Sequence, residues 1–211
     1  KQLLKKAKNV LIKLSPLFDI TELSRLFPNA AAIHIVSVDN ECKELLLYLN
    51  RKVNNSLAVI CINIPKDGRR QQFSFKLSDE AQTKACFSSA ILRYIYEPNA
   101  SIQKSGGIKN FANTYGLQML HPSTRLFTAD TKIASFQGRS FVVEAVFGFS
   151  KQELKDGLAD IKKANITIRN FPQTVAELRK KLRLDEGGEI YLFATTLLSG
   201  KKILIRCRKD S

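Results

Sequence analysis

The chain has little of what metal sites and nucleophilic active sites are usually built from. Tryptophan is absent and histidine occurs only at His34 and His121, which leaves little material for a metal site or a Ser-His-Asp triad. Four cysteines are widely separated, with no C-x-x-C pair: Cys42, Cys61, Cys86 and Cys207. This spacing predicts neither a zinc knuckle nor a disulfide framework, and it is typical of free thiols in a reducing cytosol.

Long apolar runs are also missing. The longest, around "LAVICI", has about eight residues, against the ~20 that a membrane-spanning helix needs. The opening "KQLLKKAKNVLIKL" has the charge of a leader, but Lys13 breaks its apolar part and no small-residue cleavage site follows. We therefore expect a cytoplasmic protein with no membrane partner. Because the chain does not start with Met, we also expect it to be part of a longer protein.

Acidic residues are scarce relative to basic ones. The 211 residues include 19 Asp and Glu against 34 Lys and Arg, a net charge of +15, and 44% are hydrophobic, enough for a folded core. Residues 1–65, 66–135 and 136–211 carry +4, +5 and +6, so no single tail holds the excess. Charge spread over folded segments favours a nucleic-acid phosphate backbone contacted over a long footprint.

The first segment, residues 1–65, has the pattern of an α/β unit. Apolar stretches predict strands at 8–14, 31–38 and 56–64, and helical spacing predicts helices at 19–27 and 41–52. Near-continuous apolar strands that alternate with helices are typical of a largely parallel sheet covered on both faces. Three strands are too few for such a sheet, so we expect part of a doubly wound, Rossmann-like domain.

The last segment, residues 136–211, predicts a compact α/β module. Strands are expected at 140–149, 164–171, 189–198 and 201–209, with helices at 150–161 and 172–184. Each helix opens on a capping box, Ser150 with Glu153 and Thr174 with Glu177, and the second is expected to end at Gly187-Gly188. Between the two units, residues 66–135 form a connecting region with a strand at 73–77, a helix at 78–96 capped by Ser78 and Asp79, and a further helix after Gly107.

Within the connecting region, "NASIQKSGGIKNFA" admits two interpretations. Gly106 and Gly107 can adopt positive φ and turn backbone N–H groups toward an anion, with Lys104 and Lys109 supplying charge. The spacing fits no phosphate-loop pattern, so the stretch can equally be a plain connector.

Polar residues follow the ends of the first two predicted strands, where open α/β sheets bind ligands. Asp19 can cap the helix that follows it, and Asp39 or Asn40 can cap the next one; capping and ligand contact are compatible. His34 alternates with apolar neighbours, which favours a structural role, whereas His121 lies in a loop and is the better ligand candidate.

Basic residues are densest in the last segment. One cluster lies on the predicted helix and one on the final hairpin: Arg179, Lys180, Lys181 and Arg183, then Lys201, Lys202, Arg206, Arg208 and Lys209. The two clusters form one phosphate-contacting surface if they face the same side, and otherwise each is a solvated face.

Five stretches of the sequence, taken in order, resemble a known protein family. The stretches "VLIKLSPLFDI", "IHIVSVDNECKELLLYL", "YIYEPNASIQKSGG", "FQGRSF" and "RNFPQTVAELRKKLRLDEGGEIYLFATTLLSGKKILI" resemble the C-terminal half of bacterial class I S-adenosylmethionine-dependent methyltransferases of Bacteroidetes type that carry a C-terminal THUMP-like domain. The resemblance implies that residues 1–65 complete a methyltransferase sheet, that 66–135 are a connecting or ferredoxin-like region, and that 136–211 are a THUMP-like RNA-binding module.

The resemblance also implies site residues. Those bordering the catalytic cleft would be Lys13, Ser15, Asp19, Glu97 and Asn99. The family's glycine-rich loop and acidic-Pro-Ala-Arg motif have no counterpart in these 211 residues, so S-adenosylmethionine is expected to bind the longer parent protein and not this chain.

The leading functional prediction is therefore the RNA-recognition part of an RNA methyltransferase. Its partners would be RNA, either tRNA or rRNA, and the missing N-terminal half of the same protein. One alternative is a non-enzymatic RNA-binding or ribosome-associated factor, for which the same charge suffices. A third is an enzyme that acts on a phosphorylated small molecule through the Gly106-Gly107 turn.

Overall fold

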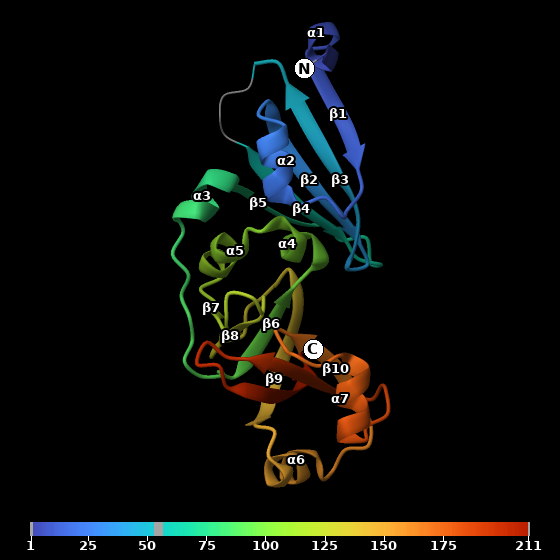
Figure 1. The fold of residues 1–211 in the computed structure, drawn as a ribbon, viewed down its shortest axis with the longest axis vertical. Helices are drawn as coiled ribbons and strands as arrows, with labels where there is room; N and C mark the ends of the chain where they lie inside the picture. Colours follow the sequence, from blue (N-terminus) through green and yellow to red (C-terminus); the bar gives the residue numbers. More distant parts are fainter. Residues whose placement is uncertain (1, 53–56, 211) are drawn as a thin grey trace. The chain divides into compact units, whose positions relative to one another are not determined.

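The computed structural model describes residues 2–52 and 57–210, and these form two compact units (Figure 1). Unit 1 comprises Lys1–Ala85 and Pro98–Tyr115, and unit 2 comprises Cys86–Glu97 and Gly116–Ser211. Each unit has one mixed sheet with helices beside it, which confirms the predicted α/β class. Ser56, where one strand was predicted to begin, lies outside the described residues.

The sheet of unit 1 has the order β1-β3-β2-β4-β5. Its strands are β1 (Asn9–Leu14), β2 (Ala30–Val38), β3 (Glu41–Asn50), β4 (Ala58–Ile64) and β5 (Gln71–Lys76). Among neighbours only β2 and β4 run parallel, and the other pairs are antiparallel. The prediction of a largely parallel, doubly wound sheet is therefore wrong in its strand directions.

The main cause is β3, which the sequence predicted as a helix over residues 41–52. Leu45, Leu47 and Leu49 are buried while the residues between them are half-buried, which is the two-residue period of a strand. Asp39 and Asn40, expected to cap that helix, instead have φ of 49° and 63° and make the tight turn between β2 and β3. Two successive positive φ values match the right-handed twist of a hairpin, so the chain turns back at once.

Helices of unit 1 are short: α1 (Gln2–Lys6), α2 (Ile20–Leu26), α3 (Leu77–Gln82), α4 (Ala100–Ser105) and α5 (Ile108–Thr114). Asp19 caps α2 as predicted, because its Oδ1 accepts a hydrogen bond from the Glu22 N–H at 3.0 Å. The helix predicted at 78–96 is wrong beyond Gln82. Lys76 stands at the N-cap of α3 without a side-chain hydrogen bond, so the predicted Ser78–Asp79 cap is also wrong.

Unit 2 contains a sheet of order β10-β11-β12-β9-β6-β8-β7. Its strands are β6 (Tyr94–Pro98), β7 (Gln118–Met119), β8 (Phe127–Ala129), β9 (Gly138–Phe147), β10 (Asn165–Arg169), β11 (Ile190–Thr196) and β12 (Lys202–Lys209). β10 and β11 are parallel, while β12 is antiparallel to both β11 and β9. Figure 1 shows α7 beside β10, and α6 lies against β9.

The helices α6 (Lys151–Leu158) and α7 (Val175–Leu182) begin as the sequence predicted. Both capping boxes are present, with the Ser150 and Thr174 hydroxyls accepting from the N–H of Glu153 and Glu177. α7 ends earlier than expected, at a left-handed Arg183 with φ 55°. One apolar cluster packs α6 and α7 on the sheet around Leu178, and a second surrounds Phe141 and Phe193.

We predict that Asn40→Ala destabilises unit 1 by about 2 kcal/mol. Alanine at positive φ costs roughly 1 kcal/mol, and the Asn40 Oδ1 that accepts from the Ala100 N–H at 2.8 Å is lost, at about 1 kcal/mol. Asn40→Gly is the matched control, since it keeps the turn and loses only the hydrogen bond. Urea unfolding followed by circular dichroism measures both; equal stability of Asn40→Ala and the parent chain would contradict this account of the turn.

Candidate nucleic-acid interface

The polar residues after β1, predicted to border a catalytic cleft, have partners inside the protein. Lys13 Nζ lies 2.7 Å from Glu44 Oε2, and the Ser15 hydroxyl accepts from the Leu17 N–H at 3.2 Å. Asp19 caps α2. These groups do not provide a vacant set of donors and acceptors that fits S-adenosylmethionine. Their assignment to a cleft stays a prediction that these contacts leave untested.

Glu97, the next predicted cleft residue, is 1% exposed and held between two arginines. Arg139 from β9 donates through Nε to Glu97 Oε2 at 2.8 Å, and Arg169 from β10 donates through Nη2 to Oε1 at 2.5 Å. A buried carboxylate is stable only with such paired donors. In unit 1, Asn99 is also buried and caps α4, its Oδ1 accepting from the Ile102 N–H.

The Gly106-Gly107 turn, the candidate anion site, already has an anion beside it. The buried carboxylate of Glu80 accepts from the N–H groups of Lys109 and Asn110, both at 2.9 Å, at the start of α5. These are the unpaired donors that a bound phosphate would use. Lys104 lies on α4 and Lys109 on α5, half-buried, with no ion pair among the described residues. The start of α5 is therefore capped from within the chain, which favours the connector interpretation, while the assignment of Lys104 and Lys109 to RNA binding stays a prediction.

Two of the predicted RNA-binding arginines are neutralised by carboxylates. Arg206 donates to Asp160 Oδ1 at 2.6 Å and to Glu144 Oε2 at 2.9 Å, and its side chain is only 13% exposed. Arg208 pairs with Glu144 and lies 3.7 Å from Glu189. A charge that is already paired contributes little to phosphate binding, so these contacts disfavour Arg206 and Arg208 as phosphate ligands.

The remaining predicted cations form no ion pair with a carboxylate among the described residues. Lys201 is close enough to Glu153 for its charge to help lower the pKa of that carboxylate. Of these cations, the exposed ones without an ion pair among the described residues are Lys180, Lys181, Arg183, Lys201, Lys202 and Lys209. Arg179 is neither paired with a carboxylate nor fully exposed. It is half-buried and donates to the Ala164 carbonyl at 3.2 Å. All lie on α7 or on the β11–β12 hairpin, in unit 2.

Burial changes the pKa of one histidine and of a cysteine. Burial and then Arg70 lower the pKa of His34, and burial raises the pKa of Cys61 to about 12. The four cysteines are free thiols. No group of three or more ligand-type side chains able to hold a metal occurs among residues 2–52 and 57–210. Within the same described ranges, no helix has the length and apolarity to cross a membrane.

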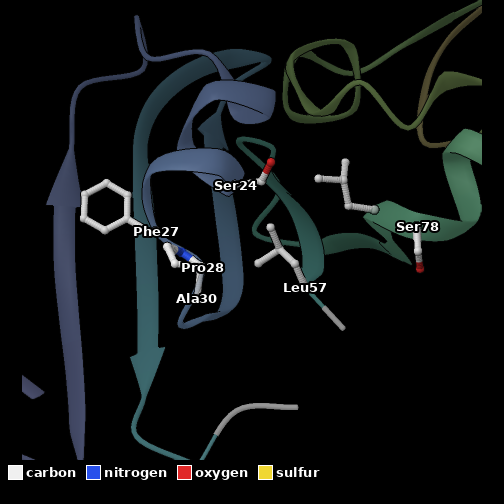
Figure 2. A pocket seen from close by; sticks show the side chains of 7 residues that line it. Ser24, Phe27, Pro28, Ala30, Leu57 and Ser78 are labelled. Atoms are coloured by element: carbon white, nitrogen blue, oxygen red, sulfur yellow. The ribbon is translucent and has the colours of Figure 1, made fainter. Parts of the chain in front are cut away.

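Both units have more than one surface hollow, and two of these hollows bear on the candidate site. The first lies in unit 1 beside α2 and the start of α3 (Figure 2), and its lining is Ser24, Phe27, Pro28, Ala30, Leu57, Leu77 and Ser78. Among the described residues its lining has no ionisable side chain, so it lacks a general acid or base. The second lies in unit 2, and its lining includes Asn170, Phe171 and Lys202. Phe171 and Asn170 were not among the predicted site residues, although they follow β10, at a strand end where ligands are expected.

Comparison with known families identifies two domain types in the chain. Residues 138–209 match the THUMP domain-like family, and residues 94–136 match a family described as a ferredoxin-like domain. The free cations and the second hollow all fall inside the THUMP domain-like match. The predicted boundaries at residues 65 and 135 are not tested by these matches.

A solved structure resembles the whole chain. It is the crystal structure of a "putative methyltransferase from Porphyromonas gingivalis W83", with a TM-score of 0.90 and 31% sequence identity, covering 100% of this chain and 53% of that one. This chain thus spans about half the length of the structure it matches. A comparison with curated proteins gave no match.

Replacing Glu97 by Gln should lower the free energy of unfolding by about 2–3 kcal/mol. Removing one partner of a fully buried pair costs about 3–5 kcal/mol, and Arg139 and Arg169 are about one-third exposed, which reduces the cost. Glu189→Gln, at an 88% exposed carboxylate, is the control and should change stability by less than about 0.5 kcal/mol. Chemical denaturation measures the loss of stability in each variant. Similar small losses in both variants would contradict a stabilising role for the ion pairs of Glu97 with Arg139 and Arg169.

The Arg206 network makes a titration prediction. Hydrogen bonding to Arg206 lowers the pKa of Asp160 to about 2, from an ordinary value of 3.8. The folded pKa is depressed, so this carboxylate stabilises the fold above pH 3.8, and the contribution is lost as the pH falls toward 2. In Arg206→Gln, carbon NMR should show Asp160 titrating near its ordinary pKa. An unchanged, low pKa in that variant would contradict the assignment of the shift to Arg206.

Proposed function

We propose that this chain is the RNA-recognition part of an S-adenosylmethionine-dependent RNA methyltransferase. The observation that supports it best is the coincidence of the THUMP domain-like match, residues 138–209, with exposed cations that no carboxylate neutralises. Lys180, Lys181 and Arg183 lie in the last turn of α7 and just past it, and Lys201 and Lys202 lie on the β11–β12 hairpin. Unpaired surface cations attract a polyanion because phosphate binding releases its condensed counterions.

The methyltransferase part of the proposal rests on the likeness to the Porphyromonas gingivalis protein. The donor would bind in a longer protein, since the polar groups after β1 and the turn after β2 are occupied by internal hydrogen bonds. In this proposal the chain alone binds RNA and transfers no methyl group. A non-enzymatic RNA-binding factor remains the alternative, because the same cations would serve it equally.

A further strand is the proposed partner of the β1 edge. β1 pairs only with β3, so one row of its backbone N–H and C=O groups has no neighbour in the described sheet. Leu11 on this strand is 63% exposed. Open apolar edges are usually covered in native proteins, and we propose that the N-terminal half of the parent protein covers this one.

The RNA proposal predicts a specific change in salt dependence. The triple variant Lys180→Gln, Lys181→Gln, Arg183→Asn removes three charges, and Asn tolerates the left-handed backbone at position 183. If all three contact phosphates of a single strand, the slope of log affinity against log salt should become shallower by about 2, at about 0.7 per contact. Fluorescence anisotropy with labelled single-stranded RNA at several salt concentrations measures the slope.

A matched variant tests whether total charge alone is responsible. Lys5→Gln, Lys6→Gln, Lys8→Gln removes the same charge from exposed positions in unit 1. We expect its salt slope to stay within about 0.5 of the parent chain. Equal slopes for the two triple variants would mean that α7 makes no particular contact, and absence of RNA binding by the parent chain would overturn the proposed function.

A further inference from the structure

The hollow in unit 2 lies at one edge of the sheet, where β10 and β11 end and β12 begins. It has a volume of about 550 Å³ and is lined by Ile168, Asn170, Phe171, Pro172, Thr196 and Lys202. β10 and β11 are parallel, so their carboxyl ends meet at this edge. Ligands of open α/β sheets bind beyond such strand ends, which makes the hollow a better candidate than the apolar one in unit 1.

One wall of the hollow is aromatic and belongs to a stack. Phe171 stacks on Phe149 with ring centroids 5.1 Å apart and planes at 30°, and Lys181 Nζ lies 5.2 Å from the Phe149 centroid. Phe171 lines the hollow and Phe149 does not. The part of the Phe171 ring that faces the hollow is therefore not covered by Phe149. A planar ligand in the hollow can therefore extend the stack.

A hydrogen-bond acceptor lies beside the aromatic wall. His121 Nδ1 accepts from the Ser123 N–H at 3.0 Å, so this nitrogen carries no proton in the neutral ring. Asn170 Nδ2 lies 3.2 Å from the same nitrogen and is its second donor. The amide of Asn170 is thereby oriented, and its Oδ1 has no partner among the described residues. That oxygen can accept from an amino group or a ring N–H.

The charge around the hollow favours an anionic ligand. Lys202 lines it and has no ion pair within the described part of the chain. The carboxylates that begin α6 and α7, Glu153 and Glu177, are each held by the hydroxyl and backbone N–H of their own capping box. They are therefore poorly placed to neutralise Lys202 and Lys181 as well.

We propose that this hollow binds one unpaired base of single-stranded RNA. The base stacks on Phe171, its hydrogen-bonding edge donates to Asn170 Oδ1, and Lys202 contacts the adjoining phosphate. This inference rests on the proposed function and narrows its substrate to RNA with unpaired nucleotides. In a duplex each base is already stacked and paired, so it is not available to the hollow.

The test compares RNA with a strand that lacks bases. Anisotropy at fixed salt gives the affinity for a single-stranded RNA of about 12 nucleotides and for an abasic ribose-phosphate strand of the same length. The parent chain should bind the RNA about ten-fold more tightly, the effect of one stacked base. Phe171→Leu should lose that preference and bind the abasic strand unchanged. Phe149→Leu, the matched control in the same stack but outside the hollow, should change RNA affinity by no more than about three-fold.

Failure of this inference is distinguishable from failure of the proposed function. If the parent chain and Phe171→Leu bind both strands equally, with steep salt dependence, the hollow takes no base and RNA binding stands. If the parent chain binds neither strand, both proposals fail. Binding of adenosine monophosphate as tightly as of the strand would overturn an RNA site in favour of a free-nucleotide site.

A second measurement covers the case in which Phe171→Leu does not fold. A strand with one 2-aminopurine should lose fluorescence on binding the parent chain, because stacking on an aromatic ring quenches this base. Asn170→Gly keeps the left-handed backbone at position 170, where φ is 51°, and should weaken binding by about five-fold. Binding without quenching would overturn the inference.

Discussion

The pairing of scarce carboxylates with arginines determines which cations of this chain are available to a ligand. Glu97 engages Arg139 and Arg169, while Glu144 and Asp160 engage Arg206. The planar guanidinium suits such bidentate contacts better than the ammonium of lysine. The arginines of the sheet are therefore largely occupied within the fold, whereas the exposed lysines of α7 and the β11–β12 hairpin have no ion pair among the described residues.

The α/β class and most strands could be predicted from the sequence, because apolar periodicity and helix caps are local signals. The Ser150 and Thr174 capping boxes and the hairpin at Ser199-Gly200 are examples. The leucines of β3 favour a helix as readily as a strand, because a dense apolar run fits either period. The turn at Asp39 and Asn40 was the decisive signal, because two residues that tolerate positive φ favour a hairpin over a helix cap.

The candidate site was less predictable, because it depends on which distant residues meet. Spacing placed Arg206 on a strand among other basic residues, but only the fold brings Asp160 and Glu144 to it. Glu97 likewise meets Arg169 across 72 positions of sequence. Phe171 and Asn170 could have been found by applying the rule on strand ends to the last module as well as the first. Their contacts with Phe149 and His121 have no sequence signature.

The most direct test of the account is a map of the RNA contact surface. Amide NMR spectra of the isotopically labelled chain, recorded during titration with a single-stranded RNA, report which residues change environment. The account predicts the largest shifts in the last turn of α7, at residues 170–172 and at Lys201 and Lys202. Shifts concentrated around Arg206, or in unit 1, would contradict the central claim that unpaired lysines in the THUMP domain-like part bind the RNA.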